Sequence, residues 1–286
     1  IVNMSFTLLI VYISIGILAG VFGAVLGLGG GMIVTPILVL GFNLPIHYAI
    51  AASIIAVIGT SSGASVAYLK DDLLNIRVAM FLEIFTTIGA LIGAVLVGIF
   101  KASWLNAFFG FLLLYQGFAM WQKMHSKKAD TLALKDDTAA RKLNLDSSYY
   151  DKLQGKEVTY HIQKVPFGAL IMFGAGFASG LLGIGSGTFK VFAMDTVMQM
   201  PLKPSSATSN FMMGVTAAAS ALIYFFNGTI QPLIVAPIAI GIIFGSTLGS
   251  KVMPYLPNKL LRGIFIPVVV LAGVQLVIKA LGINLY

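Results

Sequence analysis

The chain contains no cysteine and little charge. Only 10% of its 286 residues are charged, whereas 58% are apolar, and the mean hydropathy is +0.95. The absence of cysteine excludes disulfides, thiolate metal sites and thiol chemistry. A soluble fold would carry about 25% charged residues. These shortages exclude a soluble enzyme.

Long apolar runs take the place of the missing charge. Seven or eight stretches reach or approach the length of a bilayer span, which is about 20 residues. Because lipid offers no partner to backbone polar groups, such spans must be helical. The first run, residues 6–26, lacks a basic front and a cleavage site, so we expect a retained helix and not a signal peptide. The composition therefore predicts a polytopic, all-α membrane protein with the lipid bilayer as its surroundings.

Residues 123–164 form the only sizeable polar segment. They carry 15 charged residues, including nine of the 18 Lys and Arg of the chain. Within them, residues 149–160 place aromatic and β-branched side chains on both sides of Gly155, a pattern that suggests a small hairpin. The segment divides the chain into a first transmembrane unit (4–122), a linker (123–164) and a second unit (165–286). The basic excess reports membrane topology and predicts no nucleic-acid partner.

The second unit repeats the first at a constant offset of 156 residues, without a gap. Chance agreement between apolar sequences explains shared alanines and leucines, but hardly prolines, tyrosines and spaced glycines. The matching pairs include Gly27/Gly183, Gly29/Gly185, Gly31/Gly187, Pro45/Pro201, Ser53/Ser209, Tyr68/Tyr224, Gly89/Gly245 and Gly93/Gly249.

Basic residues indicate that the two halves are inverted. Lys and Arg favour the cytoplasmic side, where we place the basic linker. The loop with Lys70 and Arg77 has an uncharged counterpart at 226–232, whereas three bases stand where the first half has only Lys101. Those three are Lys251, Lys259 and Arg262. Equivalent loops then face opposite sides, which predicts a bundle of two inverted repeats with five crossings each. One crossing in each repeat is a short broken element, at 32–40 and 189–200. Parallel halves are the alternative.

Two glycine-rich segments interrupt apolar helices at equivalent places, Gly27–Gly31 and Gly183–Gly187. Such breaks persist in a membrane only where they are buried in protein or line a cavity. Each precedes a short helix whose first amides and positive dipole end point toward the break, which outlines an anion site. Close packing of helices on glycine is the simpler alternative. We favour the cavity, with Gly29, Gly30, Gly31, Gly185, Ser186 and Gly187 as backbone ligands.

Hydroxyl-rich helices follow Pro45 and Pro201, which we expect to act as hinges. A serine or threonine in a membrane helix usually bonds its own backbone. Ser53 and Ser209 nevertheless occupy the same repeat position, eight residues after each proline, and predict a symmetric pair of ligand-facing hydroxyls. Thr208 and Asn210 complete the expected substrate-binding residues.

Charged residues inside spans are costly and usually face an interior, a partner or a pathway. Lys190 follows the second glycine segment by three residues and is the strongest single candidate for substrate binding. A lysine that reaches the interface or pairs with Asp195 is the alternative. Glu83 either carries a coupling proton or pairs with a cation. We expect coupling to H⁺ or Na⁺ to involve Glu83 or Asp195.

These motifs resemble the TauE/SafE family of sulfite exporters, also called 4-toluene sulfonate uptake permeases. The resemblance rests on 180–185 (GLLGIG), on Lys190-Val191, on 207–212 (ATSNFM) and on Tyr149-Tyr150-Asp151. It implies transport of sulfite, sulfonates or related sulfur-containing anions, generally export driven by an ion gradient. The chain departs from the family pattern at Ser186, Phe192 and Asp195, all beside Lys190, so the resemblance predicts the site more firmly than the ligand.

The sequence thus predicts a secondary transporter that exports a small sulfur-containing oxyanion by alternating access, without a cofactor or bound metal. An anion channel is one alternative. An intramembrane enzyme is another, but three histidines, no cysteine and no paired carboxylates within a span offer little for catalysis. We expect a multi-pass protein of a prokaryotic plasma membrane. Small-residue faces suit packing within one chain or in a homodimer.

Overall fold

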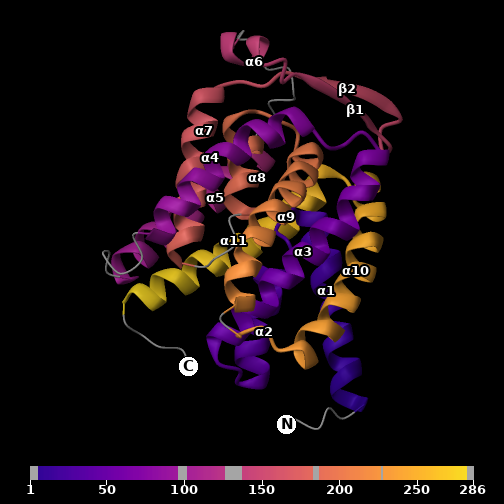
Figure 1. Cartoon of the computed structure of the whole chain (residues 1–286). Helices are drawn as coiled ribbons and strands as arrows, with labels where there is room; N and C mark the ends of the chain where they lie inside the picture. Colours follow the sequence, from indigo (N-terminus) through magenta and orange to yellow (C-terminus); the bar gives the residue numbers. More distant parts are fainter. Residues whose placement is uncertain (1–5, 96–101, 126–136, 183–186, 227, 282–286) are drawn as a thin grey trace.

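The structure, a computed structural model, describes residues 6–95, 102–125, 137–182, 187–226 and 228–281 (Figure 1). Its first unit contains α1 (Phe6–Leu26), α2 (Gly31–Phe42), α3 (Ile46–Lys70), α4 (Ile76–Val95) and α5 (Ala102–His125). The linker contains α6 (Thr138–Lys142), β1 (Ser147–Asp151) and β2 (Lys156–Tyr160). The second unit contains α7 (Val165–Leu182), α8 (Gly187–Phe192), the π-helical turn η1 (Ala193–Val197), α9 (Leu202–Phe226), α10 (Pro232–Val252), the 3₁₀ turn η2 (Met253–Tyr255) and α11 (Asn258–Ala280).

The spacing of the sequence repeat is also the spacing of the helices. Helices α8, α9, α10 and α11 begin 156 residues after α2, α3, α4 and α5, respectively. In each half a long helix ends at a glycine-rich segment, a shorter element follows, and three long helices complete the unit.

Glycines bring helices of the two halves into backbone contact. A Cβ atom added at Gly245 on α10 would lie 2.1 Å from the carbonyl oxygen of Ile17 on α1, and one at Gly89 on α4 would lie 2.1 Å from that of Phe173 on α7. The two contacts are equivalent in the repeat, because Gly245 lies 156 residues after Gly89 and Phe173 lies 156 residues after Ile17. One turn further along, Gly249 meets Val21 and Gly93 meets Phe177. In each pair, a step of four residues along one helix matches a step of four residues in the same direction along the other. Helix α1 therefore runs parallel to α10, and α4 runs parallel to α7. Small residues permit this approach where lipid supplies no hydrophobic driving force.

The distribution of polarity suits a bilayer. In the described part of the chain, five helices are long and apolar enough to cross a membrane, and they lie in α1, α3, α4, α10 and α11. Large apolar side chains such as Ile84, Phe111, Phe244 and Leu271 are exposed on the outer surface. Polar side chains, by contrast, are buried: residues 202–210 at the start of α9, which include one lysine and four hydroxyl side chains, are all buried. The chain is therefore an integral membrane protein with a polar interior.

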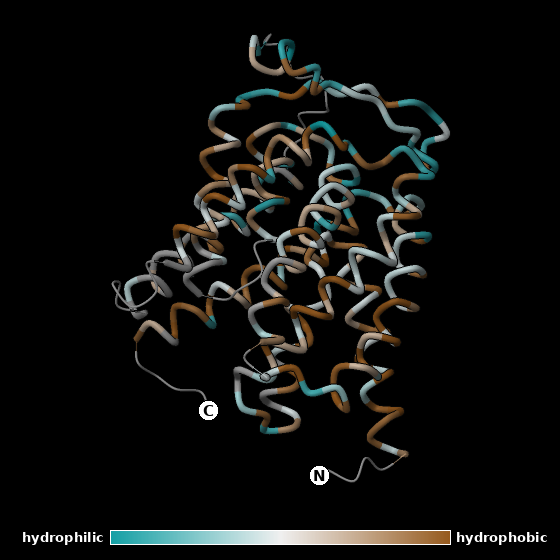
Figure 2. Tube along the Cα trace, viewed as in Figure 1, coloured by the Kyte–Doolittle hydropathy of each residue, from teal (hydrophilic) through white to brown (hydrophobic). Residues whose placement is uncertain are grey.

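The linker forms an antiparallel hairpin in the segment for which the sequence suggests one. Strand β1 pairs with β2 from Ser147↔Tyr160 to Asp151↔Lys156. Figure 2 shows that this end of the molecule is richer in hydrophilic residues than the helical bundle below it. The hairpin therefore marks one polar end of the bundle.

Ion pairs attach the hairpin to both halves. Asp151 accepts a hydrogen bond from Lys203 Nζ on α9 at 2.9 Å, and both side chains are buried. The same Lys203 donates to the carbonyl oxygen of Pro254 in η2 at 2.8 Å. Lys152 pairs at 2.7 Å with Asp71, which follows α3, and this hydrogen bond raises the pKa of Lys152. The end of α3, the start of α9 and the end of α10 thus meet at the hairpin.

Candidate substrate site at the interrupted helices

The first glycine segment interrupts the polypeptide between α1 and α2. Helix α1 ends at Leu26, and Gly27 and Gly29 then adopt φ angles of +72° and +61°, which only glycine adopts at little cost. Every residue from Gly27 to Gly31 is buried. The predicted break is therefore present, enclosed within the protein. Its counterpart at 183–186, with Gly185 and Ser186, lies outside the described residues, whereas Gly187 is buried at the start of α8.

Polar side chains cap the carbonyl groups at the end of α1. Ser206 Oγ donates to Leu26 O at 3.4 Å, Ser209 Oγ donates to Gly27 O at 2.9 Å, and both Asn210 Nδ2 and Tyr68 Oη donate to Ala24 O at 2.8 Å. Three of these four donors come from α9. Because the carbonyl end of a helix carries partial negative charge, these donors offset that charge at the break.

The amide side of the break is less satisfied. Gly30 N donates to Thr60 Oγ1 at 3.1 Å. Neither the amide nitrogen of Gly29 nor that of Gly31 has a hydrogen-bond partner within the part of the chain that the structure describes. The amide of Gly31, the first residue of the twelve-residue helix α2, is therefore unpaired at the positive dipole end of that helix, and the amide of Gly29 is unpaired just before it.

The predicted hydroxyl pair contacts both glycine segments. Ser53 forms a hydrogen bond with Thr35, which itself donates to the carbonyl oxygen of Gly31 at 3.2 Å. Ser209 donates to the carbonyl oxygens of Gly27, as above, and of Gly187 at 3.4 Å. Ser209 thus lies where the two glycine segments approach each other. In the structure its hydroxyl bonds backbone, the alternative that the sequence left open.

Thr208 lies apart from this arrangement. Its Oγ1 accepts a hydrogen bond from the amide of Asn75 at 3.2 Å, at the start of α4. Asn75 in turn donates to Leu145 O at 2.9 Å and to Tyr160 Oη at 3.1 Å in the linker. Thr208 therefore connects α9 to the hairpin end, whereas the adjacent Ser209 faces the glycine segments.

Lys190 and Glu83 form a buried ion pair between the two halves. Lys190 Nζ lies 3.0 Å from Glu83 Oε2 and 3.0 Å from Thr216 Oγ1, and Thr216 Oγ1 lies 2.6 Å from Glu83 Oε1. The lysine side chain is 0% exposed and that of Glu83 is 11% exposed. The structure thus brings two predicted residues together and adds Thr216, which the sequence reasoning did not single out.

Asp195 has a different partner. It lies in the π-helical turn η1, is fully buried, and accepts a hydrogen bond from Arg262 Nη2 on α11 at 2.8 Å. Lys190 therefore pairs with Glu83 and not with Asp195, the partner that the sequence suggested as the alternative. Two residues before Lys190 on α8, the carbonyl oxygen of Thr188 accepts a hydrogen bond from Gln116 Nε2 of α5 at 2.8 Å.

One stripe of α9 joins the glycine segments to the ion pair. Ser209, Met213 and Thr216 are spaced at i, i+4 and i+7 and so share a helix face. A Cβ atom added at Gly187 would lie 2.5 Å from Met213 Sδ, and one at Gly29 would lie 3.2 Å from Met213 Cε. Met213 therefore packs between the two glycine segments, one turn from Thr216 and the Lys190–Glu83 pair.

The two prolines stand where α3 and α9 begin. Pro45 is the N-cap of α3 with ψ at 136°, and Pro201 immediately precedes α9. Their position at the start of the helices that carry Ser53 and Ser209 is the one that the sequence indicates; their role as hinges stays a prediction.

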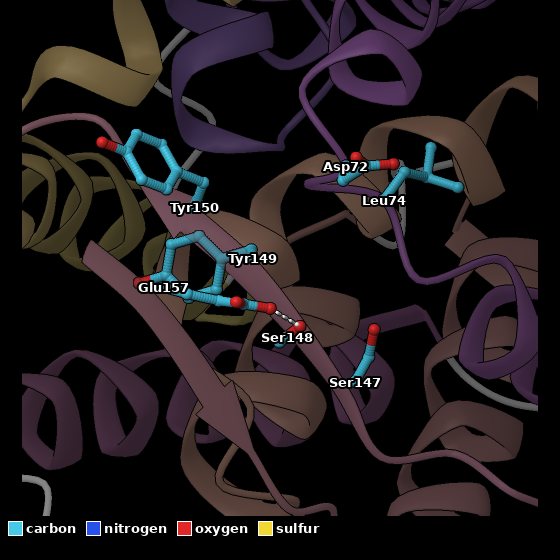
Figure 3. Close-up of a pocket in the computed structure, with 7 residues that line it drawn as sticks. All are labelled: Asp72, Leu74, Ser147, Ser148, Tyr149, Tyr150 and Glu157. Atoms are coloured by element: carbon cyan, nitrogen blue, oxygen red, sulfur yellow. Dashed lines mark hydrogen bonds between the residues drawn. The ribbon is translucent and has the colours of Figure 1, made fainter. Parts of the chain in front are cut away.

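A separate polar pocket lies beside the hairpin (Figure 3). Its volume is about 410 Å³, and its lining residues are Asp72, Leu74, Ser147, Ser148, Tyr149, Tyr150 and Glu157. Ser148 donates to Glu157 across the hairpin at 2.5 Å. These residues belong to the linker and the α3–α4 turn, and they include none of those predicted for substrate binding.

Comparison with known proteins assigns the chain to a family. The family model described as "Sulfite exporter TauE/SafE" matches residues 12–276. The chain belongs to the TauE/SafE family. The resemblance predicted from the glycine, Lys190 and 207–212 motifs is thereby confirmed, and the protein is a membrane transporter and not an enzyme.

Relatives of this TauE/SafE protein span nearly its whole length. It is 27% identical to the "Probable membrane transporter protein YunE" of Bacillus subtilis, over 97% of this chain and 99% of that protein. It is 25% identical to the "Probable membrane transporter protein MJ0441" of Methanocaldococcus jannaschii, over 89% of this chain and 90% of the relative. No solved structure matches the chain significantly.

Proposed function

We propose that this TauE/SafE protein is a secondary transporter of a small sulfur-containing oxyanion, such as sulfite or an organosulfonate, and that it binds the anion at the interrupted helices. The observation that carries the proposal is the unequal pairing of the break. Carbonyl groups at the end of α1 are capped by side chains, whereas the amides of Gly29 and Gly31 have no partner among the described residues.

This pairing favours a negatively charged ligand. Unpaired N–H groups at a helix start bind anions because their dipoles sum to a partial positive charge. Donors from Ser209 and Asn210 offset the opposing charge of the α1 carbonyls, so the positive end of α2 dominates locally. Burial strengthens the effect because the local dielectric constant is low. Gly30, Gly31 and Gly187 would supply backbone contacts, with Ser53, Ser209 and Lys190 around them.

The proposal includes inverted halves that move against each other. Equivalent helices have opposite ends at the hairpin: α3 ends there through Asp71, whereas its counterpart α9 begins there at Lys203. Likewise α4 begins there at Asn75, whereas α10 ends there beside Pro254. Opposite directions of equivalent helices support inverted repeats, in which a site between the halves opens alternately to each side. Rocking would pivot near Pro45 and Pro201.

The proposed orientation places the hairpin in the cytoplasm. Lys70, Arg77, Lys251 and Lys259 are all close in sequence to the helix ends that meet at the hairpin. The connection at 226–232 carries no charge. Basic residues concentrate on cytoplasmic loops, which supports a plasma-membrane protein with a cytoplasmic linker. Because the chain has no cysteine, single cysteines placed at Ser148 and at Gly228 can test this orientation by impermeant thiol labelling of intact cells.

Flux into liposomes tests the transport proposal. We expect saturable uptake of labelled sulfite or a sulfonate, with weaker uptake of sulfate if the site selects among oxyanions. Gly29→Ala should reduce uptake because it places a side chain at positive φ and within 3.2 Å of Val57 and Met213. Gly41→Ala is the matched control, because the added atom meets no described residue within 4 Å beyond its own helix turn. Uptake equal to that of empty liposomes for all three anions would refute the proposal, and large unitary currents would favour a channel.

A further inference from the structure

The Lys190–Glu83 pair has no free positive charge to offer an anion. Lys190 is fully buried, and its ammonium group donates to both Glu83 and Thr216 at 3.0 Å. With both side chains ionised, the pair is neutral. An arriving anion and the Glu83 carboxylate must therefore compete for one ammonium group, so the charge of Glu83 controls how well the site holds the anion.

The net charge of the site in each state shows whether the anion binds with Glu83 ionised or protonated. An anion that binds while Glu83 stays ionised leaves one uncompensated negative charge in a buried site, which is costly. If Glu83 takes up one proton, the ammonium and the anion form a neutral pair instead. The empty site and the site that holds both an anion and a proton are then both neutral, whereas any half-filled form is charged. Buried charge disfavours the half-filled forms.

Thr216 can satisfy both protonation states of Glu83. Its hydroxyl lies 2.6 Å from Glu83 Oε1 and 3.0 Å from the carbonyl oxygen of Met212. When Glu83 is ionised, the threonine donates to the carboxylate. When Glu83 is protonated, the acid donates to the threonine oxygen, and the threonine hydroxyl turns to donate to Met212 O. Glu83 Oε1 and the Thr216 hydroxyl therefore have a hydrogen-bond partner in either state, which lowers the hydrogen-bonding cost of the protonated form.

The other charged groups around the pair have their own partners. On the elements packed against it, Asp195 of η1 is bound to Arg262 of α11, and Lys203 of α9 is bound to Asp151. Helix α7 carries no titratable side chain.

The remaining titratable groups on these helices lie away from the pair or have other contacts. On α4, Arg77 is exposed and donates to Asn144 O, and on α9 Tyr224 lies eight residues beyond Thr216. On α5, Tyr115 packs its ring against Phe192. Among the described residues, Glu83 is the carboxylate within hydrogen-bond distance of Lys190.

From this geometry we propose that Glu83 carries the coupling proton: it is protonated when Lys190 engages the anion, so that the protein moves one proton with each monovalent anion. Thr216 is the positioning residue that stabilises both forms. The inference rests on the proposed function and adds the coupling ion and its site. Such a carrier exports the anion whenever the outward anion gradient exceeds the inward proton gradient, and proton and anion binding must favour each other reciprocally.

The test measures protons and anions together in liposomes that contain a trapped pH indicator. Methanesulfonate and sulfite are the probes, because methanesulfonate brings no titratable proton of its own. We expect the wild type to accumulate anion toward the alkaline side, with about one proton per methanesulfonate from the charge count. Glu83→Gln mimics the protonated acid, so it should retain anion exchange at equal pH. Its accumulation of anion driven by the pH gradient should fall at least tenfold. Asp72→Asn is the matched control, because this exposed carboxylate lies outside the site and its φ of +50° suits asparagine.

The outcomes separate the two proposals. Uptake by the wild type without protons, or a Glu83→Gln variant that still accumulates methanesulfonate along a pH gradient, would overturn the coupling role and leave anion transport standing. A wild type that moves neither probe would overturn both. If Glu83→Gln does not fold, the double variant Glu83→Gln/Lys190→Met removes the unpaired charge, and it should be unable to couple any residual flux to protons. Thr216→Val should shift the pH dependence of uptake, whereas a purely structural role would change only the amount of folded protein.

Discussion

The hydroxyl of Ser209 donates a hydrogen bond to the carbonyl oxygen of Gly27 at 2.9 Å, although 182 residues separate them in the sequence. This contact holds the start of α9, in the second half, against the interrupted end of α1, in the first. The hydrogen bond is buried, so the carbonyl has no access to water if the serine is lost. The energetics of the break therefore depend on the opposite half of the chain.

Replacement of Ser209 by alanine should destabilise the protein by about 1–3 kcal/mol, because it leaves buried carbonyl groups without a donor. The loss should appear as a lower midpoint of thermal unfolding in detergent. The midpoint is measured from the amount of protein that remains monodisperse after heating to each temperature. Ser14→Ala is a matched control, because its exposed hydroxyl bonds only Ile10 O in its own helix. Equal stability of Ser209→Ala and Ser14→Ala would show that the contact does not support the break.

Gly27→Ala should be more damaging than an ordinary glycine substitution. The residue has φ of +72°, and an added Cβ would lie 2.7 Å from Ser206 Cα, so strain and steric conflict combine. Left-handed backbone alone costs an alanine roughly 1–2 kcal/mol. In Gly174→Ala, within α7, the added Cβ has no contact within 4 Å among the described residues outside its own helix turn, so the change should instead stabilise the helix by about 0.5–1 kcal/mol. Thermal unfolding should thus change in opposite directions, and a shift in the same direction would contradict the geometry of the break.

The sequence predicted local features well and partners poorly. The break at Gly27–Gly31 and the hairpin around Gly155 arise from residues close in the chain, so their patterns are readable. Lys190 and Glu83 are 107 residues apart, and their pairing depends on the packing of both α8 and α4 against α9, which no local pattern encodes. Their position within apolar spans marked both residues as unusual, because membrane spans seldom contain charged side chains. That signal did not show which charged groups pair with each other.

Hydroxyl residues illustrate a second limit. Ser209 and Thr208 are adjacent and chemically similar, yet one faces the glycine segments and the other the start of α4. Successive helical residues point about 100° apart, because 3.6 residues complete a turn, so only one of them can face the break. Thr216 lies on the same face as Ser209, and its i+7 spacing from that residue is the signal that could have identified it.

The equivalence of the two halves predicts paired mutational effects. Gly89→Ala and Gly245→Ala each place a Cβ 2.1 Å from a carbonyl oxygen of the helix that packs alongside, Phe173 and Ile17, respectively. Both should force the paired helices apart and lower the unfolding midpoint by similar amounts, because small residues set the helix separation in membranes. Gly263→Ala on α11 is the control, because in the described part of the protein no atom of another element lies within 4 Å of the added Cβ. A large effect at one glycine and none at the other would show that the two helix pairs are not equivalent.

Lys203 and Asp151 should be strongly coupled in stability. Their ion pair is buried, with side-chain exposures of 1% and 2%, and it joins the linker hairpin to α9 and, through Pro254 O, to the end of α10. Removal of one partner, as in Lys203→Met or Asp151→Leu, should destabilise the protein by roughly 3–5 kcal/mol, because the other charge remains buried and unpaired. The double variant should recover much of this loss, since no orphan charge is left. A double-mutant cycle from thermal or denaturant unfolding measures the coupling, and strictly additive losses would mean that the two side chains do not depend on each other. Lys152→Met should cost far less, because its pair with Asp71 is partly exposed and solvent-screened.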